Sequence, residues 1–92
     1  MSIAAKRHLS RVAALGCALC RRLGYGEGVP AEVHHIRAGQ GMAQRAQDWL
    51  TVGLCPEHHR GKSGIHGDRG AFKQARVDEL DLLADTIERI CK

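Results

Sequence analysis

Apolar residues recur with a helical period at the start of the chain. The apolar positions of this stretch are Ile3, Leu9, Val12, Ala13 and Leu15. They fall near a repeat of about 3.6 residues, and basic residues take the other side, so residues 2–15 are predicted to form an amphipathic helix. Ser2 stands in the N-cap position of this helix, and Gly16 marks its end.

The end of the chain carries the same kind of signal. A short helix is predicted over residues 69–76, with Phe72 facing the core, and a final helix over residues 78–91, with Asp78 in the N-cap position. The apolar positions of the final helix are Val77, Leu80, Leu83, Ile87 and Ile90, at steps of three and four residues.

Two short apolar stretches lie between these helical segments. Residues 31–36 (AEVHHI) and 50–54 (LTVGL) are predicted to be the strands of a β-hairpin with an unusually long loop. Residues 42–48, within that loop, are predicted to form a short helical turn. Adjacent side chains of a strand point to opposite sides, so His34 and His35 are expected to have different roles.

These elements predict a small α+β fold. The length of 92 residues fits one domain, made of an N-terminal helix (1–16), a central hairpin region (17–67) and C-terminal helices (68–92). Only three residues are aromatic, so the core must be mostly aliphatic. A chain of this size benefits from a metal or disulfide that ties it together.

Charge is distributed unevenly along the chain. Residues 1–76 hold twelve Lys/Arg and five Asp/Glu, a net +7, whereas residues 77–92 hold two and five, a net −3. A basic surface suits a polyanion such as nucleic acid. Lys6, Arg7 and Arg11 interrupt what would have to be the apolar part of a signal peptide, and no run approaches the ~18 apolar residues of a membrane helix. We therefore expect a cytoplasmic protein with reduced thiols and no membrane partner.

Three cysteines and a histidine have the spacing of a zinc site. Cys17-x-x-Cys20 and Cys55-x-x-His58 form two knuckles, which are the usual way to deliver four tetrahedral ligands to a structural Zn²⁺. Taken alone, the first pair could instead be a redox pair or two unrelated thiols. Cys91, on the final helix, is expected to be a buried or end-fraying thiol rather than a ligand.

A second group of histidines gathers around the predicted hairpin. It consists of His34, His35, His59 and His66. Neutral imidazole can bind a divalent cation, or it can accept a proton near neutral pH. The group therefore offers both metal ligands and a general base.

The segments AEVHHI, LTVGLCPEHH and GIHG, together with the GCALC knuckle and VHHIRAGQG, resemble the HNH, or ββα-metal, endonucleases. Within that superfamily the chain is similar to the phage and prophage group of Ref-type, RecA-dependent nucleases. The resemblance implies a zinc-stapled ββα-metal domain with flanking helices. It also implies that His34 binds the catalytic cation, that His35 is the general base and that His59 is the second ligand. His66 would be a further ligand or a group that contacts phosphate.

The chain departs from the superfamily pattern at two points. The middle Asn of the pattern is Leu50 here, and Asp48 is the nearest residue able to brace the loop in its place. The spacing from His59 to His66 is longer than one helical turn, so a loop must present His66.

The implied activity is metal-dependent hydrolysis of DNA. His35 would activate water, and the cation, Mg²⁺ or Mn²⁺ with Zn²⁺ as an alternative, would stabilise charge on the phosphate and the leaving 3′-oxygen. Arg37, Arg60 and Lys62 are candidates to contact neighbouring phosphates. The implied partners are DNA and a RecA filament, in recombination. Two other readings remain open: a non-catalytic zinc module that binds nucleic acid or protein, and a redox or metal-storage protein.

Overall fold

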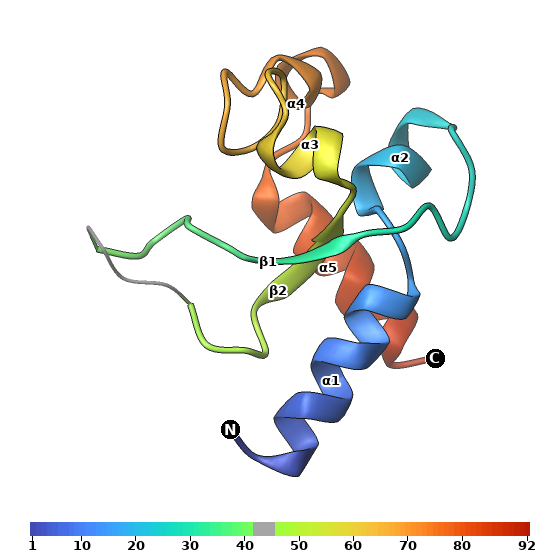
Figure 1. The fold of residues 1–92 in the computed structure, drawn as a ribbon, viewed down its shortest axis with the longest axis vertical. Coiled ribbons are helices and arrows are strands. Elements are labelled where there is room, and N and C mark those ends of the chain that lie inside the picture. The colour runs from blue at the N-terminus through green and yellow to red at the C-terminus, as the bar shows by residue number, and fades with distance from the viewer. Residues whose placement is uncertain (42–45) are drawn as a thin grey trace.

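A two-stranded antiparallel hairpin lies at the centre of the computed structural model, which describes residues 1–41 and 46–92, and helices surround it (Figure 1). The elements in chain order are α1 (Ile3–Ala14), α2 (Ala18–Leu23), β1 (Glu32–His35), β2 (Thr51–Leu54), α3 (Pro56–Arg60), α4 (Gly70–Ala75) and α5 (Glu79–Ile90). The predicted α+β class and the hairpin are confirmed. No helix among the described residues is long and apolar enough to cross a membrane.

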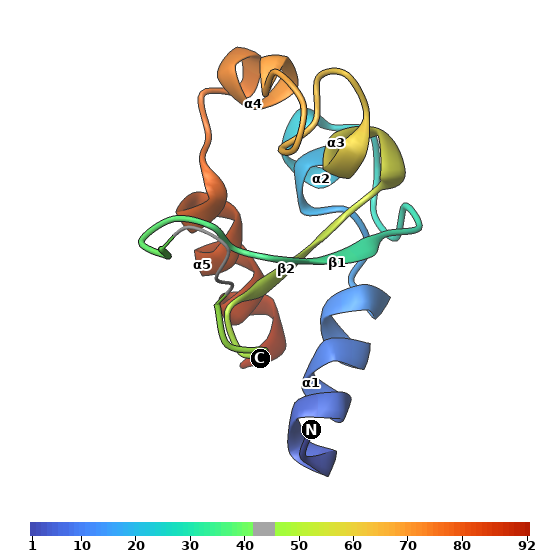
Figure 2. The ribbon, with the colours of Figure 1, turned by 60° about the vertical axis from the view of Figure 1, so that its left-hand side comes forward.

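The hairpin is the scaffold on which the other elements pack. In its register His34 pairs with Val52, and His35 pairs with Thr51. All four residues of β2 are buried, and α1, α2 and α5 each contact this strand (Figure 2). Gly53 permits the approach of the α1 end, because a Cβ there would lie 2.5 Å from the carbonyl oxygen of Gly16. The short strands therefore bring distant helices together.

The predicted N-terminal helix is present, although its buried face differs from the prediction. Ser2 is the N-cap, and its Oγ accepts a hydrogen bond from Ala5 N at 3.0 Å. Val12 is buried as expected, but Ile3 is 70% exposed and Ala5 is buried instead. In the first turn of α1, the small residue Ala5 is buried, whereas Ile3, Ala4 and Lys6 are exposed.

The predicted final helix is also present, but its buried face is rotated. Asp78 and Asp81 form a capping box at its start. Leu80 and Ile87, predicted to face the core, are 53% and 41% exposed, whereas Leu82 and Leu83 are buried. The buried face differs from the predicted one because it begins with a polar residue, Glu79. The carboxylate of Glu79 accepts hydrogen bonds at the end of β1.

Three shorter segments complete the comparison with the sequence. The predicted helix around Phe72 is α4, with that side chain buried. The turn predicted over residues 42–48 falls partly on residues 42–45, which lie outside the described residues, and Ala46 and Gln47 are not helical. The first knuckle contains an unexpected helix, α2, which begins after Cys17 because the thiol of that residue accepts a hydrogen bond from Cys20 N.

Candidate functional site

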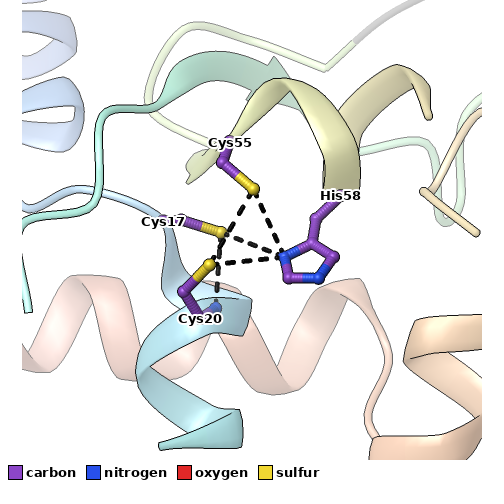
Figure 3. Close-up of side chains that lie close together, drawn as sticks. All are labelled: Cys17, Cys20, Cys55 and His58. Carbon is purple, nitrogen blue, oxygen red and sulfur yellow. Dashed lines mark hydrogen bonds between the residues drawn. The ribbon is translucent and has the colours of Figure 1, made fainter. Parts of the chain in front are cut away.

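Cys17, Cys20, Cys55 and His58 converge between α2 and α3 (Figure 3). All four are buried. The two Sγ atoms of Cys20 and Cys55 are 3.8 Å apart, and His58 Nδ1 lies 3.4 to 3.6 Å from the three sulfurs. A tetrahedral zinc with bonds of about 2.3 Å to sulfur and about 2.0 Å to nitrogen requires edges of roughly 3.5 to 3.8 Å. The predicted Cys3His set therefore has the dimensions of a zinc site.

The electrostatics of this cluster also fit a cation. Burial, together with the neighbouring Cys17, raises the pKa of the Cys20 thiol to about 12, and burial raises the pKa of Cys55. Burial lowers the pKa of His58, so this imidazole stays neutral and keeps a lone pair. Thiolates in such a place need a positive charge beside them. A structural metal such as zinc would supply that charge.

Cys91 lies outside this cluster. It is the C-cap residue of α5, and its thiol is exposed and free. Of the two alternatives expected for this thiol, a buried position or one at the helix end, the structure has the second. The residue is not part of either group of potential metal ligands found among the described residues.

His34, His59 and His66 form a second cluster, and their ligand atoms all lie within 4.8 Å of one another. Their ring centroids are 4.8 to 5.1 Å apart, so the rings surround a common point. His59 Nε2 and His66 Nε2 are 3.2 Å apart, close to the roughly 3.3 Å edge of a tetrahedral site with nitrogen ligands. The structure thus assembles three of the four histidines singled out in the sequence.

A tight loop returns His66 to His59. In this loop, as the long spacing predicts, Ile65 N donates to the carbonyl of His58 at 2.8 Å and His66 N donates to the carbonyl of His59 at 3.0 Å. Gly64 makes the return possible, because a Cβ there would lie 2.7 Å from the carbonyl oxygen of His58. The glycines of this segment therefore serve the geometry of the cluster.

Carboxylates fix the orientation of two of these imidazoles. Glu79 Oε2 lies 2.6 Å from His34 Nε2, and Glu32 Oε1 lies 2.8 Å from His59 Nδ1. An ionised carboxylate can only accept, so each of these ring nitrogens donates. The other nitrogen, Nδ1 of His34 and Nε2 of His59, keeps its lone pair for a cation. Such carboxylate–histidine pairs are the usual support of metal-binding histidines.

The pKa values of the two carboxyl groups agree with this assignment. Hydrogen bonds from Arg60 and then His59 lower the pKa of Glu32 to about 2. Burial alone would raise the pKa of Glu79, but hydrogen bonds from His34 and from the backbone N–H of Arg37 and Ala38 lower it. Both groups are therefore ionised at neutral pH.

His66 has a different environment from the other two. Its pKa is lowered by burial and then by the charges of His34, His59 and Arg37. The ring is therefore neutral at neutral pH. A neutral imidazole that faces another imidazole nitrogen needs a proton or a cation between the two lone pairs.

His35 stands apart from this triangle, as the strand geometry predicts. Its Nε2 lies 2.8 Å from Asp48 Oδ1, and no ring contact joins it to the other histidines within the described residues. The sequence offered Asp48 as a brace for the loop. Its carboxylate accepts from His35, while its carbonyl accepts from Thr51 Oγ1 at 3.0 Å. The pairing leaves His35 Nδ1 as the basic atom.

The three predicted phosphate-contacting residues have different surroundings. Arg60 forms an ion pair with Glu32, with Nη2 and Oε2 2.8 Å apart, so it also supports the carboxylate behind His59. Arg37 is exposed, and its backbone N–H donates to Glu79. Lys62 is exposed at the start of the returning loop.

Sequence reasoning missed Glu32 and Glu79, the two carboxylates behind the imidazole cluster. Glu32 had a signal, because an acidic residue inside a strand is unfavourable unless it has a partner. Glu79 had a weaker signal, since it falls in the first turn of a helix, where acidic residues are common because they interact favourably with the helix dipole. Its burial depends on how α5 packs against β1.

Comparison with known protein families matches residues 2–90 to the family described as "Recombination enhancement, RecA-dependent nuclease". No curated protein and no solved structure matches the chain. The family match spans nearly the whole sequence and includes both the Cys3His cluster and the imidazole cluster. The chain therefore belongs to the RecA-dependent nuclease family.

Proposed function

We propose that this protein is an HNH-type endonuclease that hydrolyses phosphodiester bonds in DNA with the help of a divalent cation. The observation that carries the proposal is the triangle of His34, His59 and His66, whose ligand nitrogens all lie within 4.8 Å of one another. Three protein ligands with an open position are typical of catalytic metal sites. The order β1, β2, α3 supports a ββα-metal arrangement around this triangle.

In this proposal the residues divide the chemistry between them. His35 accepts a proton from water at Nδ1, and Asp48 holds its ring and stabilises the imidazolium that forms. His34, His59 and His66 would hold the cation, Mg²⁺ or Mn²⁺ with Zn²⁺ as an alternative, and it would supply charge stabilisation on the phosphate and the leaving 3′-oxygen. Glu79 and Glu32 keep two of these rings in the tautomer that can bind a cation.

The Cys3His cluster has a structural role in the proposal. A closed set of four protein ligands leaves no position for substrate. Zn²⁺ bound there would tie α2 to α3 and so fix the helix that carries His59. His58 and His59 would serve different metals although they are adjacent.

The family description implies DNA and RecA as partners. We therefore propose that the protein acts on DNA in recombination, together with a RecA filament. The net charge of +4 is consistent with a nucleic-acid substrate.

The test is cleavage of supercoiled plasmid by zinc-loaded protein in Mg²⁺ or Mn²⁺, with and without a RecA filament on homologous DNA. Wild type should nick or cut the plasmid, and His35→Ala should lose at least about a hundredfold in rate with its zinc content unchanged. A folded, zinc-loaded wild type that binds DNA but cuts under none of these conditions would instead favour a non-catalytic zinc module.

A further inference from the structure

A cleft of about 450 Å³ lies beside the imidazole cluster, between α4 and the start of α5. Its floor is apolar, formed by Ile65, Phe72, Val77 and Leu80. Leu80 is 53% exposed although it belongs to a helix that packs on the core. Of the residues that line this cleft, the proposed mechanism uses only Glu79.

The rim of the cleft is strongly basic. Arg37, Arg69, Lys73 and Arg76 line it. In the part of the chain that the structure describes, none of these four side chains forms an ion pair. The rim therefore offers unneutralised positive charge above an apolar floor.

Neither acidic residue of the cleft forms an ion pair with this rim among the described residues. The carboxylate of Asp78 caps α5 by accepting from Asp81 N at 3.0 Å. Glu79 accepts from His34 and from the backbone N–H of Arg37 and Ala38. Both carboxylates are already committed to hydrogen bonds within the protein.

Backbone conformation gives an independent sign of function at this cleft. Arg69 and Arg76, the residues at the two ends of α4, have φ of 61° and 59°. These are the only positive φ values at residues other than glycine within the described chain. Glycine fits this conformation best, and strained residues of other types gather at functional sites. The chain keeps arginine at both positions, and both line the cleft.

Residues that line the cleft adjoin the imidazole cluster. Ile65 in its floor precedes His66, and Glu79 in its wall holds His34 at 2.6 Å. Arg37, on its rim, lies close enough to His66 for its charge to affect that ring. A strand whose phosphate lies at the cluster would therefore place its next nucleotide at the cleft.

We infer that the cleft binds one unpaired nucleotide of the DNA strand, next to the phosphate that is cut. Phosphate oxygens would lie on the basic rim, and the base on the apolar floor. The volume of about 450 Å³ lies in the range of pockets that hold a ligand the size of one nucleotide. The substrate is therefore DNA with an unpaired nucleotide at the cut, and this placement relative to the scissile phosphate rests on the proposed function.

An acidic peptide has a similar combination of charge and apolar groups. The position of the cleft favours the nucleotide over the peptide. Glu79 lines the cleft and also orients His34 of the imidazole cluster, so the cleft lies next to the proposed site of cleavage. Competition by an acidic peptide distinguishes the two ligands.

The test measures binding of zinc-loaded protein to a labelled strand of roughly 20 nucleotides and to the duplex of the same sequence, without added Mg²⁺ or Mn²⁺. Fluorescence anisotropy gives both affinities. The cleft variants are Lys73→Glu and Leu80→Asp. Their matched controls are Lys6→Glu, on an exposed face of α1, and Ile87→Asp, at an exposed position of α5 outside the cleft.

Wild type should bind the single strand at least about tenfold more tightly than the duplex, and each cleft variant should weaken strand binding about tenfold. Each control should stay within about twofold of wild type. Arg76→Gly should raise the melting temperature, because it relieves the left-handed backbone, and yet weaken strand binding. Loss of binding in a protein of higher stability cannot come from unfolding.

Equal affinity for strand and duplex would overturn the inference, and so would cleft variants that match their controls. Displacement of the strand by a glutamate-rich peptide as effectively as by unlabelled strand would assign the cleft to a protein partner and overturn it too. Failure of the proposed nuclease function would give another result: strand binding would follow the expected pattern, but no DNA would be cut.

Discussion

Glu79 Oε2 lies 2.6 Å from His34 Nε2, in a buried contact that joins the first turn of α5 to the end of β1. The same carboxylate accepts hydrogen bonds from the backbone N–H of Arg37 and Ala38. One side chain thus orients a ring of the imidazole cluster and ends the strand that carries it.

Replacing this carboxylate tests whether it supports a cation site. Glu79→Gln keeps the volume and removes the charge that fixes the His34 tautomer. We expect Mn²⁺ affinity to fall about 10- to 100-fold and the free energy of unfolding to fall by about 1 to 3 kcal/mol. Calorimetric titration with Mn²⁺ and urea unfolding measure the two effects. Unchanged Mn²⁺ affinity would show that the pair serves stability alone.

Asp48 and His35 should act as a unit. Asp48→Asn removes the acceptor charge behind the ring, so we expect a loss of about 10- to 100-fold in cleavage rate with little change in Mn²⁺ affinity. The double variant with His35→Ala should be no slower than His35→Ala alone. Single-turnover cleavage rates of the four proteins form the cycle. Losses that multiply in the double variant would mean that the two residues act independently.

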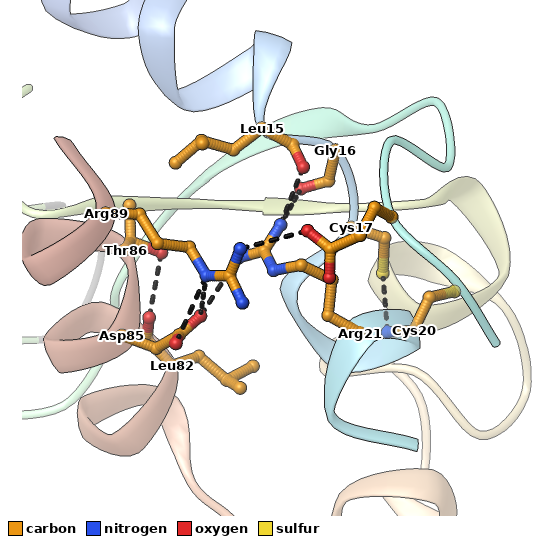
Figure 4. Close-up of polar contacts among 10 residues, drawn as sticks. Leu15, Gly16, Cys17, Cys20, Arg21, Leu82, Asp85, Thr86 and Arg89 are labelled. Carbon is orange, nitrogen blue, oxygen red and sulfur yellow. Dashed lines mark hydrogen bonds and ion pairs between the residues drawn. The ribbon is translucent and has the colours of Figure 1, made fainter. Parts of the chain in front are cut away.

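A partly buried ion-pair network should make stability depend on pH. Arg21, whose side chain is 3% exposed, donates to Asp85 Oδ2 at 3.0 Å and to the carbonyl oxygen of Leu15 at 2.6 Å (Figure 4). Burial alone would raise the pKa of Asp85, but hydrogen bonds from Arg21 and Arg89 lower it below 3.8. The network therefore stabilises the protein above the unfolded-state pKa, and this contribution is lost as the pH falls through the lower folded-state pKa.

Asp85→Asn tests this dependence. At about pH 5 the variant should be less stable by about 1 to 2 kcal/mol, and at about pH 2 the difference should be smaller. Urea unfolding of both proteins at each pH measures it. Acid also releases thiolate-bound zinc. This loss destabilises wild type and variant equally, so it cancels in the difference between their free energies of unfolding. A difference that is the same at both pH values would exclude titration of Asp85 as its cause.

The elements of the fold could be predicted because they follow local rules. Ser2 and Asp78 begin helices through side-chain caps, and the hairpin strands were placed to within about two residues. The buried faces of α1 and α5 were predicted less well. Counting apolar residues placed Leu80 in the core, whereas the fold buries Glu79 beside it, because three hydrogen bonds at the end of β1 compensate for burying that charge.

The clusters of the site were predictable for a different reason. Cysteine and histidine at knuckle spacing have few uses besides binding one ion, so the spacing alone is enough to name the Cys3His set. The carboxylates behind the histidines could not be named in this way, because Glu32 and Glu79 lie far apart in the sequence and meet their partners only through tertiary packing. The basic cleft at α4 depends on the same packing.

The most direct test of the account is a comparison of two neighbouring substitutions in α3, His58→Ala and His59→Ala. Zinc per chain and plasmid cleavage in Mg²⁺ or Mn²⁺ are measured for each. We predict that His58→Ala loses zinc and folds poorly, whereas His59→Ala keeps one tightly bound zinc and its fold but loses cleavage. A His59→Ala protein that still cuts at the wild-type rate, or a His58→Ala protein that keeps its zinc, would contradict the division between a structural and a catalytic metal.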